Sequence, residues 1–434
     1  MSNTTSADLH SRLLRVSEPI AEILRRTQYT PQESSKVSTK DILLSLLPNT
    51  SPPPPPPPPP RLLDEEQSLA SIKSLALACA LLSSSRSSAH ELLSWIPESL
   101  SVAGESAFSE IARDYFSENK RLVIELLPVV LPELKDGIEG SSMGKDGDAE
   151  DVSAAMARKP VGYAILASHQ LMWFVTQVDK PNLAKVCNLV VPCALTALDH
   201  WSPDVKRQGV ISFVHLAKTT SSGDLGSYGD VVLDACCQNI ASDDEIWIHV
   251  VELSVLLVTK LHPNNPRSSW YEKVMNEMLG HLERQPRNKE RRIAWLTFVE
   301  PLLNSLGLFL LAHFRRIFPL FFQWMHSDDG ETVLLVLERV ETVVRLTWIR
   351  NSPVFTRLVE ELVSLYKESS MRKERDEIRI LILRILKLLR ECKRLQFESA
   401  WRQYQEDPNL SMVEEYICGP ALSEPREPLV GSAV

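Results

Sequence analysis

The segment Gly140-Ser141-Ser142-Met143-Gly144-Lys145-Asp146 has the spacing that comes nearest to a phosphate-binding loop in this chain. Such a loop holds phosphate oxygens with backbone amides and a lysine, and it needs a Ser or Thr hydroxyl after the lysine to bind magnesium. Asp146 stands in that place, Glu139 replaces the leading glycine, and no apolar strand precedes the segment. We therefore expect no nucleotide site here.

Metal ligands are equally poorly placed in the sequence. Asp146-Gly147-Asp148 begins like a calcium loop, but the alternating ligands and the glutamate at the twelfth position are missing. Neither a Cys-x-x-Cys nor a His-Glu-x-x-His spacing occurs, so zinc has no recognisable ligand set. We expect no catalytic residue, no metal site, no cofactor and no small-molecule substrate.

The cysteines indicate a reducing compartment. Their number is odd, and most of them stand in apolar stretches, which is typical of reduced thiols in a protein core. The N-terminus lacks a basic segment followed by an apolar one, so we expect no secretory signal and a cytoplasmic location, with the nucleus as a second compartment. The seven residues are Cys79, Cys187, Cys193, Cys236, Cys237, Cys392 and Cys418.

Two short basic clusters are the candidate binding residues. Both contain acidic residues as well and fall at expected turns between helices, which favours solvated turns with local ion pairs. The alternative is a patch that docks an acidic segment of a partner. The candidate residues are Arg287, Lys289, Arg291 and Arg292 in the first cluster, and Arg372 and Lys373 in the second.

Composition limits the partners that this chain can have. The net charge is -9, and an acidic surface repels the phosphate backbone, so we expect no nucleic acid. The most apolar stretch, 302–322, is interrupted by Asn304, His313, Arg315 and Arg316. Hydrocarbon does not tolerate such groups without partners, so the stretch predicts buried helices and no membrane span.

These residues must be positioned by helices. Hydrophobic residues make up 44% of the 434-residue chain, enough for a sizeable core, and 15 glycines are few for a protein built of strands and turns. The pattern predicts the following segments: 1–51, an N-terminal helical segment; 52–60, a polyproline linker; 61–136, helical hairpins; 137–157, a flexible acidic, Gly/Ser-containing loop; 158–418, a helical solenoid; and 419–434, a disordered tail.

The linker Pro52–Pro60 is an unbroken run of proline. Proline donates no backbone hydrogen bond, and such a run adopts an extended polyproline helix. It can serve as a stiff spacer or as a ligand for an aromatic-lined groove. We favour the spacer, because the flanking basic pattern that would fix an orientation is missing beyond Arg61.

Regularly spaced helix starts are the main feature of the C-terminal two thirds of the chain. Helices that follow a polar break are expected to begin near six positions about 41 to 43 residues apart, which is the period of HEAT and armadillo repeats. Each unit contains two helix-length patterns, so the repeating element is a helix hairpin that is stable only when it stacks on its neighbours. The six starts are Pro160, Pro203, Asp244, Asn288, Gly330 and Lys373.

Residues 182–217 form the clearest repeat. Pro203 opens its second helix at a position where a missing N–H does no harm. Val205 begins an apolar stripe along that helix, and Gly209 is expected to let a neighbouring helix approach closely. The signature residues of this repeat are Pro192, Asp199, Pro203, Val205, Lys206 and Gly209.

The block from Val190 to Leu216 resembles the second Tel-interacting protein family, the smallest subunit of the Triple T complex. Its second-helix pattern is also similar to the HEAT consensus, in which an acidic turn residue can accept backbone N–H bonds. The chain departs from the pattern at His200 and Trp201. The similarity is carried by Pro192, Leu195, Leu198, Asp199, Pro203, Val205, Lys206, Gly209, Val210, His215 and Leu216.

The resemblance implies a non-enzymatic co-chaperone. With two larger helical-repeat partners, such a protein supports the maturation and stability of phosphatidylinositol-3-kinase-related kinases alongside heat-shock chaperones. The residues themselves predict only an all-α solenoid that binds proteins over a large surface. A HEAT-repeat adaptor in transport or trafficking and an enzyme with an unrecognised site stay open as alternatives.

Overall fold

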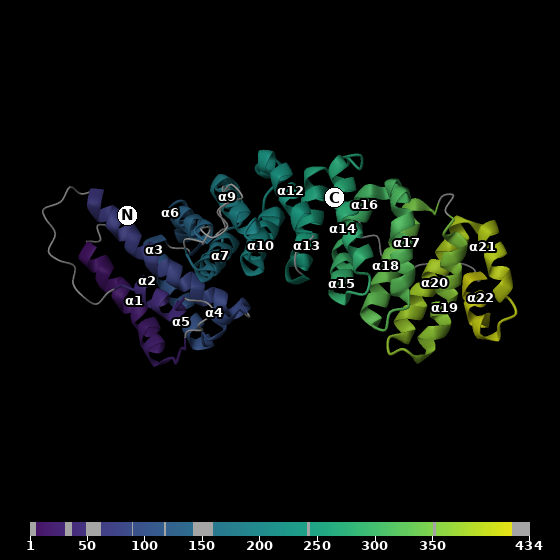
Figure 1. Ribbon diagram of the computed structural model, residues 1–434, viewed down its shortest axis with the longest axis horizontal. Helices are drawn as coiled ribbons and strands as arrows, with labels where there is room; N and C mark the ends of the chain where they lie inside the picture. Colours follow the sequence, from purple (N-terminus) through teal and green to yellow (C-terminus); the bar gives the residue numbers. More distant parts are fainter. Residues whose placement is uncertain are drawn as a thin grey trace, which may run out of the picture. The chain divides into compact units, whose positions relative to one another are not determined.

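The computed structural model describes residues 6–30, 37–48, 62–88, 90–116, 119–141, 159–240, 244–349 and 353–418. The chain forms two compact units, Met1–Leu261 and His262–Val434. Throughout the described ranges the regular structure is helical, with no strand, so the predicted all-α class is confirmed. Figure 1 shows helix pairs that follow one another within each unit.

The first unit begins with the longer helices and continues with regular hairpins. Short 3₁₀ turns, η1 (Ser85–Ser87) and η2 (Gly226–Tyr228), interrupt the helical chain. Its α-helices are α1 (Ser6–Arg26), α2 (Thr39–Leu46), α3 (Leu62–Ser84), α4 (Glu91–Ser94), α5 (Glu98–Phe116), α6 (Asn119–Glu139), α7 (Val161–Thr176), α8 (Asn182–Lys185), α9 (Cys187–Leu198), α10 (Pro203–Thr219), α11 (Ser222–Leu225), α12 (Gly229–Asn239) and α13 (Asp244–Leu261).

The second unit is also built of α-helices with short 3₁₀ turns between some of them. Its α-helices are α14 (Ser269–Arg284), α15 (Lys289–Phe298), α16 (Glu300–Leu306), α17 (Phe314–Met325), α18 (Gly330–Thr347), α19 (Phe355–Glu368), α20 (Arg375–Cys392), α21 (Arg394–Trp401) and α22 (Ser411–Cys418). Its 3₁₀ turns are η3 (Gly307–His313), η4 (Ser369–Met371), η5 (Arg402–Tyr404) and η6 (Pro408–Leu410).

Each unit consists of two layers of helices. In the first unit α3, α7, α10 and α13 pack one against the next, and α5, α6, α9 and α12 form the other layer. In the second unit α15, α18 and α20 form one layer and α14, α17, α19 and α21 the other. Neighbouring hairpins thus cover each other's apolar faces, which is the stacking of an α-solenoid.

The helix starts follow the predicted period. Helices α7, α10, α13, α15, α18 and α20 begin at Val161, Pro203, Asp244, Lys289, Gly330 and Arg375. All six lie within two residues of the starts expected from the sequence, and successive starts are 41 to 45 residues apart. The polar breaks work as caps, since Asn288 and Asp329 accept hydrogen bonds from the third residue of their helices.

The apolar stretch near residue 310 is divided by glycine. Gly307 has a φ of +51°, a backbone conformation that favours glycine, and it ends α16 before η3 begins. Among the described residues, Glu300–Met325 has the length and composition of a membrane span, with half of its apolar window buried inside the protein. Leu302, Phe318 and Phe321 are buried there, as expected for core helices.

Several predicted segments lie largely or wholly outside the described residues. These are the polyproline run 52–60, most of the loop predicted at 137–157, and the tail 419–434. Helix α6 continues to Glu139, a little beyond the predicted end at 136. The division between the two units falls inside the predicted solenoid 158–418, and the predicted boundaries stay predictions.

Candidate protein-binding surface

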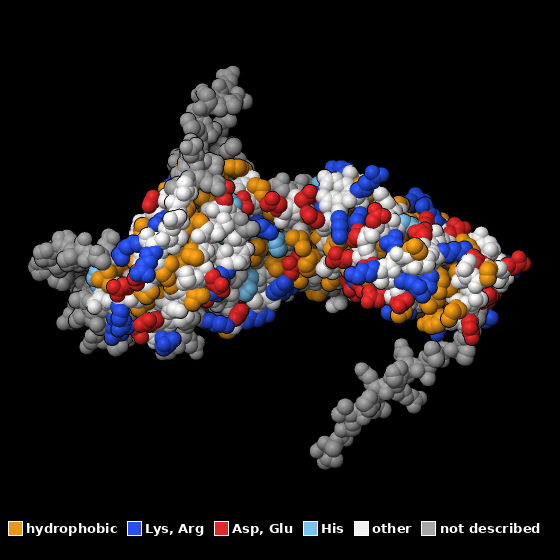
Figure 2. All heavy atoms as spheres, turned by 90° about the horizontal axis from the view of Figure 1, so that it is seen from below, with side chains coloured by type: hydrophobic (Ala, Val, Ile, Leu, Met, Phe, Trp, Pro, Cys, Tyr) orange, Lys and Arg blue, Asp and Glu red, His pale blue; other side chains and the backbone are white. Residues whose placement is uncertain are grey.

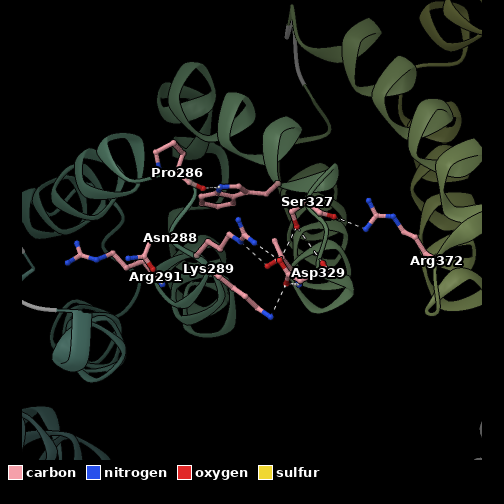
Figure 3. A network of polar contacts seen from close by, with 10 residues as sticks. Pro286, Asn288, Lys289, Arg291, Ser327, Asp329 and Arg372 are labelled. Atoms are coloured by element: carbon pink, nitrogen blue, oxygen red, sulfur yellow. Dashed lines mark hydrogen bonds and ion pairs between the residues drawn. The ribbon is translucent and has the colours of Figure 1, made fainter.

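The turns of the second unit are joined by a polar network (Figure 3). Asp329 caps α18 by accepting the backbone N–H of Thr332 at 2.9 Å. Arg292, in the first turn of α15, donates one hydrogen bond to Asp329 and another to the Thr332 hydroxyl at 3.0 Å. Lys289 lies 3.8 Å from the same carboxylate. One acidic cap thus connects two successive repeats.

The network continues on both sides of Asp329. Arg372 donates to the backbone carbonyl of Ser327 at 2.7 Å, which ties the turn before α20 to the turn before α18. The indole N–H of Trp324 donates to the carbonyl of Pro286 at 2.8 Å. In the first unit Lys206 makes the equivalent link by donating to the side-chain oxygen of Asn239 at 2.7 Å.

Electrostatics fix the charge at the centre of this network. Partial burial alone would raise the pKa of Asp329, but the hydrogen bonds from Thr332 and Arg292 and the charge of Arg292 outweigh it. They hold the pKa of Asp329 at about 2. The carboxylate is therefore ionised at neutral pH, and it binds the basic residues of the preceding turn.

The structure separates the six basic candidate residues into two kinds. Arg291, Arg292 and Arg372 are buried or half-buried in contacts within the protein, and Arg291 is only 4% exposed. Arg287 and Lys373 are exposed, as is Lys289 beside Asp329. Figure 2 shows basic and acidic side chains interspersed over the second unit on the side drawn. The clusters connect repeats, and docking stays a prediction for the exposed residues.

The signature residues of the best repeat are mainly structural. Pro203 occupies the first turn of α10, and Val205 is fully buried. A side chain at Gly209 would place its Cβ 2.8 Å from the backbone N of Leu198, so α9 approaches α10 as closely as the sequence predicts. Pro192 lies inside α9, partly exposed.

Asp199 differs from the pattern of the consensus. It is exposed at the C-terminal cap of α9, and Ser202, the N-cap residue of α10, makes no side-chain capping hydrogen bond. The Nδ1 atom of His200 instead accepts the Ser202 N–H at 3.1 Å. The capping role that the consensus implies for an acidic turn residue is therefore wrong for this turn, and Asp329 has that role in a later repeat.

The buried thiols and imidazoles are poor catalysts. Burial raises the pKa of Cys79 and of Cys193 to about 12 and also raises that of Cys236, so these thiols stay protonated. Burial lowers the pKa of His169 and of His200 to about 4, which keeps both rings neutral. The described residues contain no group of three side chains arranged to hold a metal ion.

Two other features bear on an active site. Gly140-Ser141-Ser142-Met143-Gly144 fits the Gly-x-Ser-x-Gly pattern of hydrolases, but that motif follows a strand, and here helix α6 leads into it. In the described part of the chain, two cavities measure about 220 and 180 Å³. Both are smaller than the roughly 300 Å³ at which pockets for small molecules generally start.

Exposed apolar side chains are the feature that sequence reasoning missed. Trp348 is 58% exposed at the end of α18, whereas Trp247, Trp295 and Trp324 are buried in the core. Leu308 and Phe309 in η3 and Leu395 in α21 are also exposed.

Comparisons with known proteins give two relatives. The Arabidopsis thaliana protein "Uncharacterized protein At2g39910" is 80% identical over 428 residues, which cover 95% of this chain and 96% of that protein. The Homo sapiens protein "TELO2-interacting protein 2" is 25% identical over 210 residues, which cover 45% of this chain and 41% of the human protein. No model of a known protein family matches the chain.

Solved structures show weaker likeness. An engineered protein has a TM-score of 0.44 at 9% identity, over 96% of this chain and 95% of its own. The crystal structure of Kap121p has a TM-score of 0.44 at 10% identity, over 92% of this chain and 42% of its own.

Proposed function

The chain belongs to the same family as the Arabidopsis thaliana protein At2g39910, and we propose that this family works as a protein-binding scaffold without an active site of its own. The similarity to human TELO2-interacting protein 2 is the observation that carries the proposal. The two stacks of helix hairpins support it, because stacked repeats offer long surfaces for binding proteins.

The more specific proposal is a subunit of a Triple T-like complex. In that role the chain binds larger helical-repeat proteins, and the complex supports the maturation and stability of phosphatidylinositol-3-kinase-related kinases with the heat-shock chaperones. The name of the human relative supports a partner of the TELO2 type, and the match covers less than half of either chain. We place the complex in the cytoplasm, with the nucleus as a second compartment.

Affinity purification tests the proposal. The tagged full chain, expressed at its natural level in its native cells, is expected to recover large helical-repeat proteins in near-stoichiometric amounts. Depletion of the chain is expected to lower the steady-state amount of the kinases without lowering their messenger RNA. Recovery of cargo proteins and transport receptors instead would favour an adaptor in trafficking, and recovery of a clean monomer would contradict both.

A further inference from the structure

A small surface pocket in the first unit is lined by two aromatic rings. It measures about 220 Å³ and lies between helix α4 and the residues that follow α1. The ring centroids of Tyr29 and Trp95 are 4.5 Å apart, and the rings meet at an angle of 43°. Both side chains are half-buried, so each keeps part of its surface open to solvent. The other lining residues are Gln28, Thr30, Glu91, Leu92 and Ser94.

Hydrogen bonds hold both rings in place. The indole N–H of Trp95 donates to the backbone carbonyl of Leu92 at 2.8 Å. The hydroxyl of Tyr29 accepts the backbone N–H of Thr39 at 3.2 Å. Because the polar atoms of both side chains are used within the protein, the pocket presents the faces of the rings. A ligand would meet rings that are already ordered, which reduces the entropy lost on binding.

The lining residues exclude most ways of binding a peptide. Addition of a strand needs the edge of a sheet, and the described ranges contain no strand. An amphipathic helix needs a groove with several apolar contacts, and Leu92, which is itself buried, is the one aliphatic residue in the lining. Phosphorylated or acidic segments need arginines, and no Arg or Lys lines the pocket. The recognition mode that remains is a polyproline helix packed on aromatic rings.

The chain itself contains a ligand of this kind. The proline run Pro52–Pro60 is followed directly by Arg61. Consecutive prolines favour the polyproline helix, so little conformational entropy is lost when such a segment binds. Glu91 is the one charged residue among those that line the pocket. Its carboxylate is complementary to the guanidinium of Arg61, and this pair of charges would fix the direction of the bound run.

The proline run is too far from the pocket of its own chain. Arg61 directly precedes Leu62, where α3 begins, and the 23 residues of α3 extend about 35 Å. Helix α4, which carries part of the pocket, contacts η1 at the opposite end of α3 (Figure 1). If Pro52–Pro54 occupied the pocket, the remaining chain up to Leu62 would span only about 25 Å as a polyproline helix. A run that fills the pocket therefore comes from a second copy of the chain.

We propose that this pocket binds the proline run of a second copy of the chain, with prolines packed on Tyr29 and Trp95 and with Arg61 beside Glu91. The contact joins two copies of the chain in solution. It goes beyond the proposed scaffold function, because it concerns the association of the chain with itself. The aromatic rings supply the apolar contact area, and the two opposite charges set the direction of the run.

Analytical ultracentrifugation of the full chain tests the proposal. The wild type is expected to form dimers at concentrations of about 100 μM or less. Glu91→Lys is expected to raise the dissociation constant of the dimer at least tenfold. The control is Glu98→Lys, because Glu98 is also exposed in the first turn of a helix, α5, but does not line the pocket. The control should associate like the wild type, and a wild type that stays monomeric would overturn the proposal.

An exchange of charges tests whether the two ends of the contact meet. Arg61→Glu alone is expected to weaken the dimer as Glu91→Lys does. The double variant, with Arg61→Glu and Glu91→Lys together, is expected to recover most of the lost association, because the charges attract again. A double variant whose loss equals the sum of the two single losses, expressed as free energies, would show that the two residues do not meet and would overturn the proposal.

A labelled peptide of residues 51–62 tests the pocket directly. Its binding to the full chain, measured by fluorescence anisotropy, is expected to be at least tenfold weaker in Trp95→Leu, which removes the flat ring. A peptide in which every second proline is alanine is expected to bind less tightly, because it no longer favours the polyproline helix. Trp95 also packs within the protein, so Glu91→Lys, at an exposed position, is the variant that tests the pocket without disturbing the fold. Unchanged peptide affinity in Glu91→Lys would overturn the proposal.

The source of the proline run is decided by the two measurements together. Dimers that Glu91→Lys dissociates, together with peptide binding that needs Trp95, support the second copy as the occupant. A monomeric wild type that binds the peptide through Trp95 would assign the pocket to a proline-rich segment of another protein and overturn the proposal. Dimers that neither Glu91→Lys nor Trp95→Leu weakens would place the contact elsewhere on the chain and overturn it as well.

Discussion

A carboxylate in place of Val205 would be buried between stacked helices. Val205 is fully buried in α10, which packs against α7, α9 and α13. We expect Val205→Asp to lower the free energy of unfolding by about 3 kcal/mol or more, because an ionised group loses its hydration there. Urea denaturation followed by circular dichroism measures this change.

The matched control for this substitution is Val231→Asp in α12, where the valine is 54% exposed. A change within about 0.5 kcal/mol is expected there. Similar losses in the two variants would mean that the acidic side chain harms the protein generally, and that the burial of Val205 is not the cause.

At Gly209 the limit is set by space, because even a methyl group is too large for this position. Its Cβ would lie 2.8 Å from the Leu198 backbone N and 3.0 Å from the Ala194 carbonyl, and backbone atoms cannot move aside cheaply. Gly209→Ala is expected to cost about 1 to 3 kcal/mol. The control Gly280→Ala, whose nearest atom is 3.7 Å away on Arg316, should stabilise α14 by up to about 1 kcal/mol. Thermal denaturation measures both effects: the melting temperature should fall in Gly209→Ala and stay the same or rise in Gly280→Ala.

At the scale of helices, the Asp329 cap predicts a pH dependence. Asparagine can replace the cap but not the charge, so Asp329→Asn is expected to cost about 1 to 2 kcal/mol at pH 7. The pKa of Asp329 is about 2, below its usual value of 3.8, so the charged form stabilises the folded state. This advantage is present above pH 4 and is lost as the pH falls towards 2.

Urea denaturation at pH 7, 4 and 3 should therefore show the difference between the wild type and Asp329→Asn becoming smaller. Asp376→Asn is the control, because Asp376 also lies in the first turn of a helix but its side chain is 88% exposed. Its effect should be small at every pH. A constant difference for Asp329→Asn would mean that the ion pair with Arg292 does not stabilise the folded state.

The helix starts were predictable because they depend on local chemistry. Pro203, Asn288 and Asp329 stand at polar breaks, and each break repeats at the period of the hairpin. The layers follow from the same period, since each hairpin must cover its neighbour. The fold class, the repeat length and most of the helix faces that are buried between hairpins can therefore be predicted from the sequence.

The contacts between turns were not predictable from local chemistry. Arg292 reads as one member of a basic cluster, and only the stacking of α15 on α18 shows that it binds Asp329. The exposure of Phe309, Trp348 and Leu395 leaves no periodic signal in the sequence either, because such residues occur about once in each repeat. A single apolar residue in a long repeat looks like part of the core.

At the scale of the whole molecule, the stacking of repeats predicts that a destabilising substitution affects mainly the helices near it. Each hairpin contacts its neighbours, so stability is approximately a sum of repeat and interface terms. The two units separate most clearly after Leu261. A defect in one unit should therefore loosen that unit before it affects the other.

Amide hydrogen exchange on paired variants tests this expectation. Val205→Asp is expected to speed exchange in α9, α10 and α13 and to leave α18 and α20 protected as in the wild type. Val340→Asp, at a fully buried position of α18, is expected to produce the reverse. Uniform acceleration along the chain in either variant would mean that all helices unfold together. Local acceleration would allow the surface of one unit to adapt to a partner while the other keeps its structure, which suits a scaffold.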